Sequence, residues 1–195
     1  FVILCVVLTI VTTSATAADK LHFAHALKKG LEDIIIQDHE AFLDAALEMV
    51  EPINNLCDDP SKKNLEAVHK NFEVLVLQWS RIEMYHFGPA LENNLFEKLF
   101  YWPDRRGRAI RQVRTVLSRQ DQTVLTIETL AQKSVAVQGL LALEFILFGT
   151  GSETLVIGNH HRCSYLGSIA GVIATNASSL LGGWKGDDGY ATEMM

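Results

Sequence analysis

The sequence predicts an all-α protein built as an up-down helical bundle. Its clearest signal lies between residues 65 and 86, where apolar residues recur in alternating steps of three and four. The recurring residues are Leu65, Val68, Phe72, Leu75, Trp79, Ile82 and His86. This spacing is typical of one buried helix face. No segment shows the alternation of apolar and polar residues that is typical of strands, and Gly and Pro separate the long apolar segments.

The elements are predicted in chain order from the same two signals. A helix over residues 31–50 should end at Glu51-Pro52, and residues 54–61 form a turn cluster that holds Cys57. The seam helix should end at Phe87-Gly88-Pro89, because Gly favours a left-handed cap and Pro cannot continue a helix. The remaining predictions are a long connection over 90–107, helices over 108–119, 123–132, 135–148 and 162–181, a loop over 149–161, and a break at 182–184.

The first residues have the pattern of a secretory signal peptide. Residues 1–11 are apolar and uncharged, and small residues follow, with Ala15 and Ala17 in an A-x-A arrangement. We therefore expect cleavage after Ala17, no transmembrane segment in the mature chain, and a periplasmic protein. The predicted domains are a signal peptide over 1–17, a helical bundle over 18–184, and a truncated inter-domain loop over 185–195.

Charge and cysteine content narrow the class of protein further. The formal net charge is −6 without a long basic run, which argues against a nucleic-acid binder. After cleavage the chain keeps Cys57 and Cys163. An even pair in an oxidising compartment favours a disulfide, and two free buried thiols are the alternative.

Glu144 is the only charge between residues 134 and 152. We expect this segment to be a buried helix, in which an isolated carboxylate needs a partner: an Arg, a metal, backbone donors or its own proton. The structural alternative is an ion pair with Arg81, Arg111, Arg114 or Arg162. The functional alternative is a metal ligand or an acid in a binding cleft. Gly139, five residues earlier, should let another backbone segment come close.

Glu83 and His86 form an E-x-x-H pair on the seam helix. Pairs of this kind build di-iron sites when two helices each supply one. The second pair, Glu66 and His69, lies too far along the same helix to share a site with the first. His86 is therefore expected at the edge of the core, where it joins Glu144 if their helices face each other. The sequence contains no H-E-x-x-H, G-x-S-x-G or P-loop motif.

Several blocks of sequence, in this order, resemble the imelysin-like family of periplasmic iron-regulated proteins, which is grouped with the M75 peptidases. The blocks are Leu56-Cys57, residues 79–83, Phe87-Gly88-Pro89, residues 100–107 (FYWPDRRG), residues 135–148 (VAVQGLLALEFILF) and residues 162–165 (RCSY). The resemblance implies two related helical bundles with a cleft between them, of which this chain is the first. It also implies a cell-envelope protein that is linked to iron uptake.

The family's proposed metal motif is G-x-H-x-x-E. Gly139 and Glu144 match this motif, but Leu141 stands at the His position. Because leucine cannot bind a metal, the resemblance favours a non-catalytic protein over an enzyme. The alternatives are a metallopeptidase-like hydrolase, which would take ligands such as His86 or residues of the second bundle, and a purely structural or partner-binding bundle.

The resemblance also implies a cofactor and partners, and it adds to the site residues singled out above. Iron or another divalent metal is the implied cofactor. The implied partners are iron or a haem-type ligand and the cell-envelope components of iron uptake. The predicted metal- or ligand-binding residues are Glu144, His86, Glu83, Trp102, Asp104 and Arg105.

Overall fold

Helices make up every regular element in the computed structural model, which describes residues 13–185 and 189–194, with side chains from residue 22 onward. No strand occurs in these residues, so the all-α prediction is confirmed. The longer helices are α1 (Thr13–Gly30), α2 (Gln37–Glu48), α3 (Val50–Asp58), α4 (Lys62–Ile82), α6 (Arg108–Arg119), α8 (Gly139–Phe148) and α9 (His160–Lys185). The shorter ones are η2 (Leu31–Ile36), η3 (Gly88–Asn94), α5 (Leu95–Leu99), η4 (Gln122–Val124), α7 (Ile127–Leu130), η5 (Val135–Val137), η6 (Ser152–Ile157) and α10 (Tyr190–Glu193).

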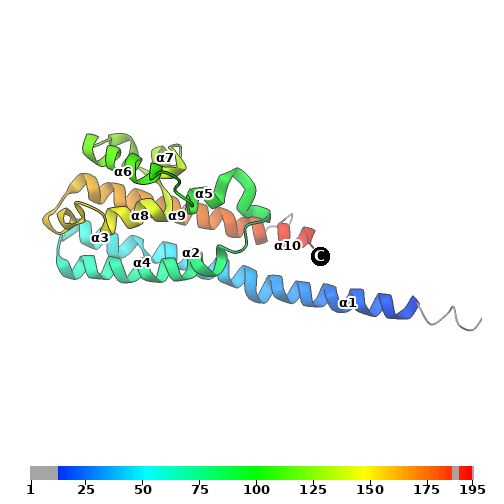
Figure 1. Cartoon of the computed structure of the whole chain (residues 1–195). Helices are drawn as coiled ribbons and strands as arrows, with labels where there is room; N and C mark the ends of the chain where they lie inside the picture. Colours follow the sequence, from blue (N-terminus) through cyan, green and yellow to red (C-terminus); the bar gives the residue numbers. More distant parts are fainter. Residues whose placement is uncertain (1–12, 186–188, 195) are drawn as a thin grey trace, which may run out of the picture.

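The bundle is built around α9. Figure 1 shows α2, α3 and α8 lying along α9, α4 packed on α2 and α3, α6 and α7 covering one side, and α1 running outward from the bundle. Among the described residues, one helical region, His160–Glu193, is long and apolar enough to cross a membrane by length and composition. Of its most apolar window, 56% is buried inside the protein. This burial is what the central helix of a bundle requires.

The seam predicted from residue 65 onward forms the buried face of α4. Val68, Phe72, Leu75, Trp79 and Ile82 are all buried, which confirms the spacing argument for these residues. The helix starts where the Ser61 side chain accepts a hydrogen bond from the backbone N–H of Asn64 at 3.2 Å. It ends at Ile82, before His86 is reached.

Two further helix ends differ from the prediction. Pro52 does not end a helix but lies in the first turn of α3. Backbone N–H groups in a first turn have no intrahelical acceptor, so the missing N–H of proline costs no hydrogen bond there. Gly182 and Gly183 do not break α9, which continues to Lys185. A Cβ atom at Gly183 would lie 2.7 Å from the Cβ of Pro89, so this glycine allows close helix packing.

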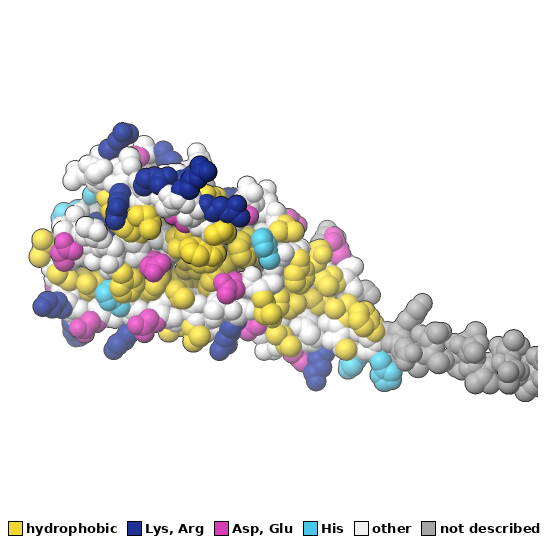
Figure 2. Space-filling model, in the orientation of Figure 1, with side chains coloured by type: hydrophobic (Ala, Val, Ile, Leu, Met, Phe, Trp, Pro, Cys, Tyr) yellow, Lys and Arg dark blue, Asp and Glu magenta, His cyan; other side chains and the backbone are white. Residues whose placement is uncertain are grey.

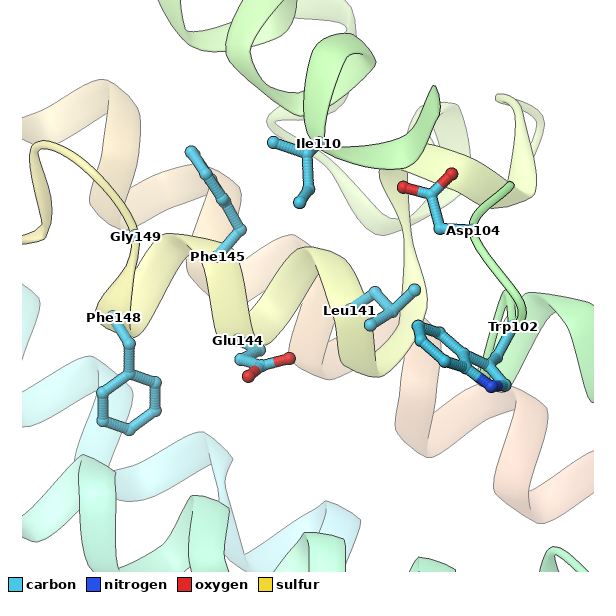
Figure 3. A pocket seen from close by; sticks show the side chains of 8 residues that line it. All are labelled: Trp102, Asp104, Ile110, Leu141, Glu144, Phe145, Phe148 and Gly149. Carbon is cyan, nitrogen blue, oxygen red and sulfur yellow. The ribbon is translucent and has the colours of Figure 1, made fainter. Parts of the chain in front are cut away.

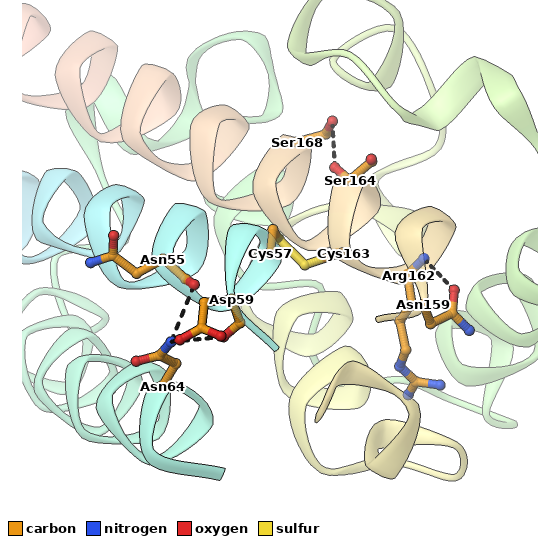
Figure 4. The surroundings of a disulfide bond; sticks show 9 residues. All are labelled: Asn55, Cys57, Asp59, Asn64, Asn159, Arg162, Cys163, Ser164 and Ser168. Carbon is orange, nitrogen blue, oxygen red and sulfur yellow. Dashed lines mark hydrogen bonds between the residues drawn. A yellow bond between two sulfur atoms is a disulfide. The ribbon is translucent and has the colours of Figure 1, made fainter. Parts of the chain in front are cut away.

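The two cysteines of the predicted mature chain form a disulfide. Cys57 near the end of α3 is joined to Cys163 in the first turn of α9, across a sequence separation of 106 residues (Figure 4). Asn64 of α4 donates from Nδ2 to the backbone carbonyl of Asp59 at 2.7 Å. The disulfide and this hydrogen bond together fix one end of the bundle.

Gly139 starts α8 with a left-handed backbone, φ +77°. A Cβ atom there would lie 2.6 Å from the carbonyl oxygen of Leu99 and closer still to that of Lys98. Only glycine tolerates both this φ and this approach. The prediction that Gly139 admits another backbone segment is therefore confirmed. The predicted helix over 135–148 is accordingly divided into η5 and α8.

A small second core joins the start of the bundle to its last described residues. Leu31, Trp184 and Ala191 are its buried members, and Tyr190 packs against them. The Nε1 of Trp184 donates to the Nε2 of His39 at 3.1 Å, which ties α9 to α2. The segment predicted as a loop over 185–195 thus contains α10, because α10 has apolar partners in this core.

The predicted signal peptide lies mostly outside the described residues. Its apolar part, residues 1–11, is not described, and α1 begins at Thr13. This helix runs through the predicted cleavage site after Ala17 without a break. Cleavage there, and the domain boundaries that depend on it, stay predictions.

Candidate functional site

One stripe of α8 remains at the surface while the rest of the helix is buried. Leu141, Glu144, Phe145 and Phe148 follow the three-and-four spacing of a single helix face, and none of them is fully buried. Figure 3 shows this face between α6 on one side and α4 on the other. The stripe is the floor of two adjoining grooves.

The two grooves share Trp102, Leu141 and Glu144. The first, here called the α6 groove, has a volume of about 260 Å³. The second, the α4 groove, has a volume of about 410 Å³. The α6 groove is lined by Trp102, Asp104, Ile110, Leu141, Glu144, Phe145, Phe148 and Gly149. The α4 groove is lined by Phe72, Val76, Trp79, Ser80, Glu83, Phe100, Trp102, Leu140, Leu141 and Glu144. Both linings are mainly apolar and aromatic, as in sites for organic ligands.

The prediction that Glu144 is buried is wrong. Its side chain is exposed, and it projects from α8 on the side that faces α4 (Figure 3). In the described part of the chain the ion pairs are Lys28–Glu32 and Lys185–Glu40, so none of the four arginines considered pairs with Glu144. The carboxylate needs no buried partner, because it marks the one stripe of α8 that solvent reaches.

Arg162 has a different role from the one considered for it. It is 4% exposed, and its guanidinium donates to the backbone carbonyls of Phe145, Ile146 and Thr150, each at 3.1 Å. These carbonyls lie at the C-terminal end of α8 and just beyond it, where helices leave acceptors without partners. Burial lowers the pKa of Arg162. The residue therefore fixes the end of the helix that carries Glu144.

Trp102 stands over the grooves on the loop that follows α5. It is 63% exposed and stacks on Phe100, with ring centroids 6.2 Å apart. The close approach at Gly139 positions this loop, because Leu99 lies only three residues before Trp102. An exposed indole beside two apolar grooves is a surface on which a flat ligand can stack.

Asp104 and Arg105 follow Trp102 but differ in position. The Asp104 carboxylate accepts hydrogen bonds from the backbone N–H groups of Arg108 at 2.6 Å and Ala109 at 3.1 Å, so it caps α6. It also forms part of the α6 groove wall. Arg105 is exposed and lies outside both groove linings. Of these two predicted site residues, the structure places Asp104 alone at the grooves.

Glu83 and His86 do not form a pair on one helix face. Because α4 ends at Ile82, Glu83 is the C-terminal cap and His86 lies beyond the helix. Glu83 lines the α4 groove with Glu144, whereas His86 is exposed and stacks on Phe96 with ring centroids 4.0 Å apart. The expectation that His86 joins Glu144 is therefore not met.

The residues around Glu144 do not fit the metal that the family resemblance implies. No group of three or more His, Cys, Asp or Glu residues that could hold a metal ion occurs within the described residues. Leu141 lies on the same stripe as Glu144 and offers no donor atom. Two carboxylates, Glu83 and Glu144, are the acidic groups of the α4 groove, and a transition metal requires further ligands.

Apart from Trp102, the aromatic members of the grooves were not predicted as site residues. Phe145 lies beneath the guanidinium of Arg114, at 5.5 Å from ring centroid to Cζ, and Phe148 is 49% exposed. The sequence places both residues on the same helix face as Glu144, because their spacing from it is helical. The sequence does not show which face of a nearly all-apolar helix meets solvent.

Comparisons with known proteins agree with the fold. The family model of imelysin, peptidase M75, matches residues 35–195. The chain is similar to the crystal structure of an imelysin-like protein from Psychrobacter arcticum, with a TM-score of 0.72 and 24% identity over 83% of this chain and 49% of that one. A comparison with curated proteins finds no match.

A second solved structure has the same fold. It is a protein from Parabacteroides distasonis described as an iron-regulated protein A precursor, with a TM-score of 0.69 and 16% identity over 86% of this chain and 48% of that one. The chain spans about half the length of the two solved structures. Because the family model matches most of its residues, the chain belongs to the imelysin family, peptidase M75.

Proposed function

We propose that this chain is one bundle of an exported, non-catalytic imelysin-like binding protein that acts in iron acquisition, with the two grooves beside Glu144 as its ligand site. The observation that carries the proposal is the open stripe of α8. Phe148 is 49% exposed on that stripe, and Trp102 is 63% exposed above it. Apolar surface of this kind, gathered over a groove, is typical of a binding site.

The groove chemistry favours iron held within an organic complex over a bare iron ion. A bare ion requires several oxygen, nitrogen or sulfur donors at close range. The grooves offer the carboxylates of Glu83, Glu144 and Asp104, of which Asp104 already accepts from the backbone of α6, and otherwise mainly carbon surface. A flat haem-type ligand would bury that surface against Trp102 and Leu141. The link to iron is supported by the relative from Parabacteroides distasonis, which is described as iron-regulated.

Export to the periplasm is supported by two features of the chain. The apolar residues 1–11 and the A-x-A pattern ending at Ala17 predict a signal peptide. The Cys57–Cys163 disulfide requires an oxidising compartment to persist. Such a protein would work with other cell-envelope components of iron uptake.

The metallopeptidase alternative gains no support from the described residues. Metal-activated water requires three protein ligands around the ion. Here Leu141 occupies the position of the family's His, and His86 stacks on Phe96 and does not line either groove.

Thermal melting of the full-length mature protein tests the proposal. The probes are haemin, ferric citrate, ferrous sulfate and zinc chloride. Haemin should raise Tm, because a ligand at 100 times its Kd stabilises the folded state by about 2.7 kcal/mol. Trp102→Ala should remove this rise. Glu128→Gln, an exposed glutamate on α7, is the matched control for Glu144→Gln and should leave the rise unchanged.

Three results would overturn the proposal. The first is the absence of any shift with all four probes. The second is a haemin shift that persists in Trp102→Ala. The third is a shift with ionic iron alone that Glu144→Gln removes, which would establish a metal site. Chelator-sensitive cleavage of a peptide library would replace the binding protein with a hydrolase.

A further inference from the structure

Positive charge is concentrated in one segment of an acidic protein. Residues 98–119 carry six Arg and one Lys but a single acid, Asp104, whereas the whole chain has a net charge of −6. α6 itself contains no acidic residue. Its buried face consists of Ala109, Val113 and Val116, so the arginines lie on the remaining faces of the helix. The positive charges are therefore gathered on one part of the folded surface as well as in one segment of the sequence.

These arginines are exposed and largely without partners. The exposed members are Arg105, Arg106, Arg108, Arg111, Arg114 and Arg119. Neither ion pair found among the described residues includes any of them. The nearby carboxylate of Asp104 accepts from backbone N–H groups at the start of α6. A cluster of like charges that is not neutralised within the protein attracts an anionic partner.

The guanidinium groups differ in the contacts they make within the protein. Arg111 donates to the backbone carbonyl of Arg106, and Arg114 lies over the ring of Phe145. Arg105 and Arg108 make no side-chain hydrogen bond or ion pair to another residue in the described part of the chain. Arg presents a planar fork of donors that matches phosphate oxygens, a geometry that Lys lacks.

Exposed apolar side chains border the arginines. Ile110 on α6 is 44% exposed, and Trp102 on the preceding loop is 63% exposed. Figure 2 shows dark-blue side chains over α6 directly above a yellow apolar hollow, whereas blue and magenta alternate along the opposite edge of the view. Basic residues beside Trp and aliphatic side chains are typical of surfaces that lie on a membrane.

We infer that the α6 face, defined as α6 with residues 102–106, docks on an anionic phospholipid surface. The arginines contact lipid phosphates, and the indole of Trp102 lies at the level of the headgroups. The acidic remainder of the protein is repelled by the same surface, which orients the molecule with α6 toward the lipid. The exposed Trp102 and Ile110 favour a bilayer over a soluble polyanion or a nucleic acid, neither of which offers an apolar layer.

Vesicle binding by the full-length mature protein tests this inference. The protein is sedimented with vesicles of pure phosphatidylcholine and of equimolar phosphatidylcholine and phosphatidylglycerol. Binding should occur with the anionic vesicles alone and should be lost in about 1 M salt, where the Debye length is ~3 Å. Tryptophan fluorescence should shift to the blue, because Trp102 is exposed while Trp79 and Trp184 are buried.

Two matched triple variants identify the surface. Arg105→Gln with Arg106→Gln and Arg108→Gln should weaken vesicle binding about 100-fold, since each arginine contributes a factor of about five. Lys62→Gln with Lys63→Gln and Lys70→Gln removes the same charge from exposed positions on α4 and should leave binding unchanged. A thermal melt of each variant separates loss of binding from loss of folding.

Several results would overturn the inference. They are equal binding to both kinds of vesicle, no binding to either, and equal losses in the two triple variants. Another is tight binding of soluble polyphosphate or of a DNA duplex that displaces the vesicles and leaves the fluorescence of Trp102 unshifted. That result would assign the α6 face to a soluble polyanion.

Discussion

Replacing Gly139 with alanine tests how the grooves are positioned. The residue has φ +77°, a backbone conformation that costs an L-residue roughly 1–2 kcal/mol. The added Cβ would also lie 2.6 Å from the carbonyl oxygen of Leu99, and relieving such overpacking costs about 1–3 kcal/mol. Alanine recovers about 0.4–1 kcal/mol by restricting the unfolded chain. The free energy of unfolding should therefore fall by about 2–4 kcal/mol.

Urea unfolding followed by far-ultraviolet circular dichroism measures this change. Gly182→Ala is the matched control, because Gly182 is exposed in α9 and a Cβ there meets no atom within 4 Å. The free energy of unfolding of that variant should rise by up to about 1 kcal/mol, because alanine has a higher helix propensity than glycine. The reasoning fails if Gly139→Ala unfolds within about 0.5 kcal/mol of the parent protein, or if both substitutions destabilise it equally.

Three further predictions concern stability. Replacing Cys57 and Cys163 with serine should cost about 4–5 kcal/mol in urea unfolding, as the chain-entropy model gives for a loop of 106 residues, and reductant should have no further effect on that variant. Arg162→Met should cost about 3 kcal/mol, because three carbonyls at the end of α8 lose a charged donor, and Arg162→Lys should recover little of it. Burial lowers the folded-state pKa of His39 below its ordinary value of about 6.5, so the unfolded state binds more protons. The contribution of His39 to the free energy of unfolding should be fully present above about pH 6.5. Below that pH it should fall by up to about 1.4 kcal/mol per pH unit until the folded-state pKa is reached. A pH series of urea midpoints that is as steep in His39→Gln as in the parent protein would contradict this.

The sequence predicted the parts of the fold that rest on periodicity. The buried face of α4 follows from the regular spacing of Val68 to Ile82, although Val74 and Leu77 on other faces of the helix are apolar and exposed. Gly139 could likewise be identified as a point of close approach, since a glycine in an apolar segment has few other uses.

Periodicity failed where one whole element was apolar. In α8 the sequence does not distinguish the buried residues from the exposed stripe of Leu141, Glu144 and Phe148. A lone carboxylate in such a segment predicts a buried charge, but a single charge on an apolar helix also marks its solvent-facing side. Local sequence could not decide between these alternatives, because the position of α6 and α4 around α8 is a tertiary property.

The roles of Arg162 and His86 depended on where helices end. Arg162 donates to carbonyls at the C-terminal end of α8 and just beyond it, whose position depends on α8 stopping at Phe148. His86 does not continue the buried face of α4, because this helix ends at Ile82, four residues earlier than the spacing suggested. Helix boundaries are the least certain part of any assignment from sequence, and errors there propagate directly to candidate sites.

The central position of α9 has a consequence for the order of folding. Its contacts join it to segments made far earlier: Cys163 to Cys57, and Trp184 to His39 at a separation of 145 residues. While the chain is being synthesised, α2 and α3 exist before the helix that packs on them. Contacts between residues far apart in the sequence form slowly. Until they form, the partly folded chain exposes apolar surface that promotes aggregation. We therefore expect chains released before α9 is complete to depend on a chaperone.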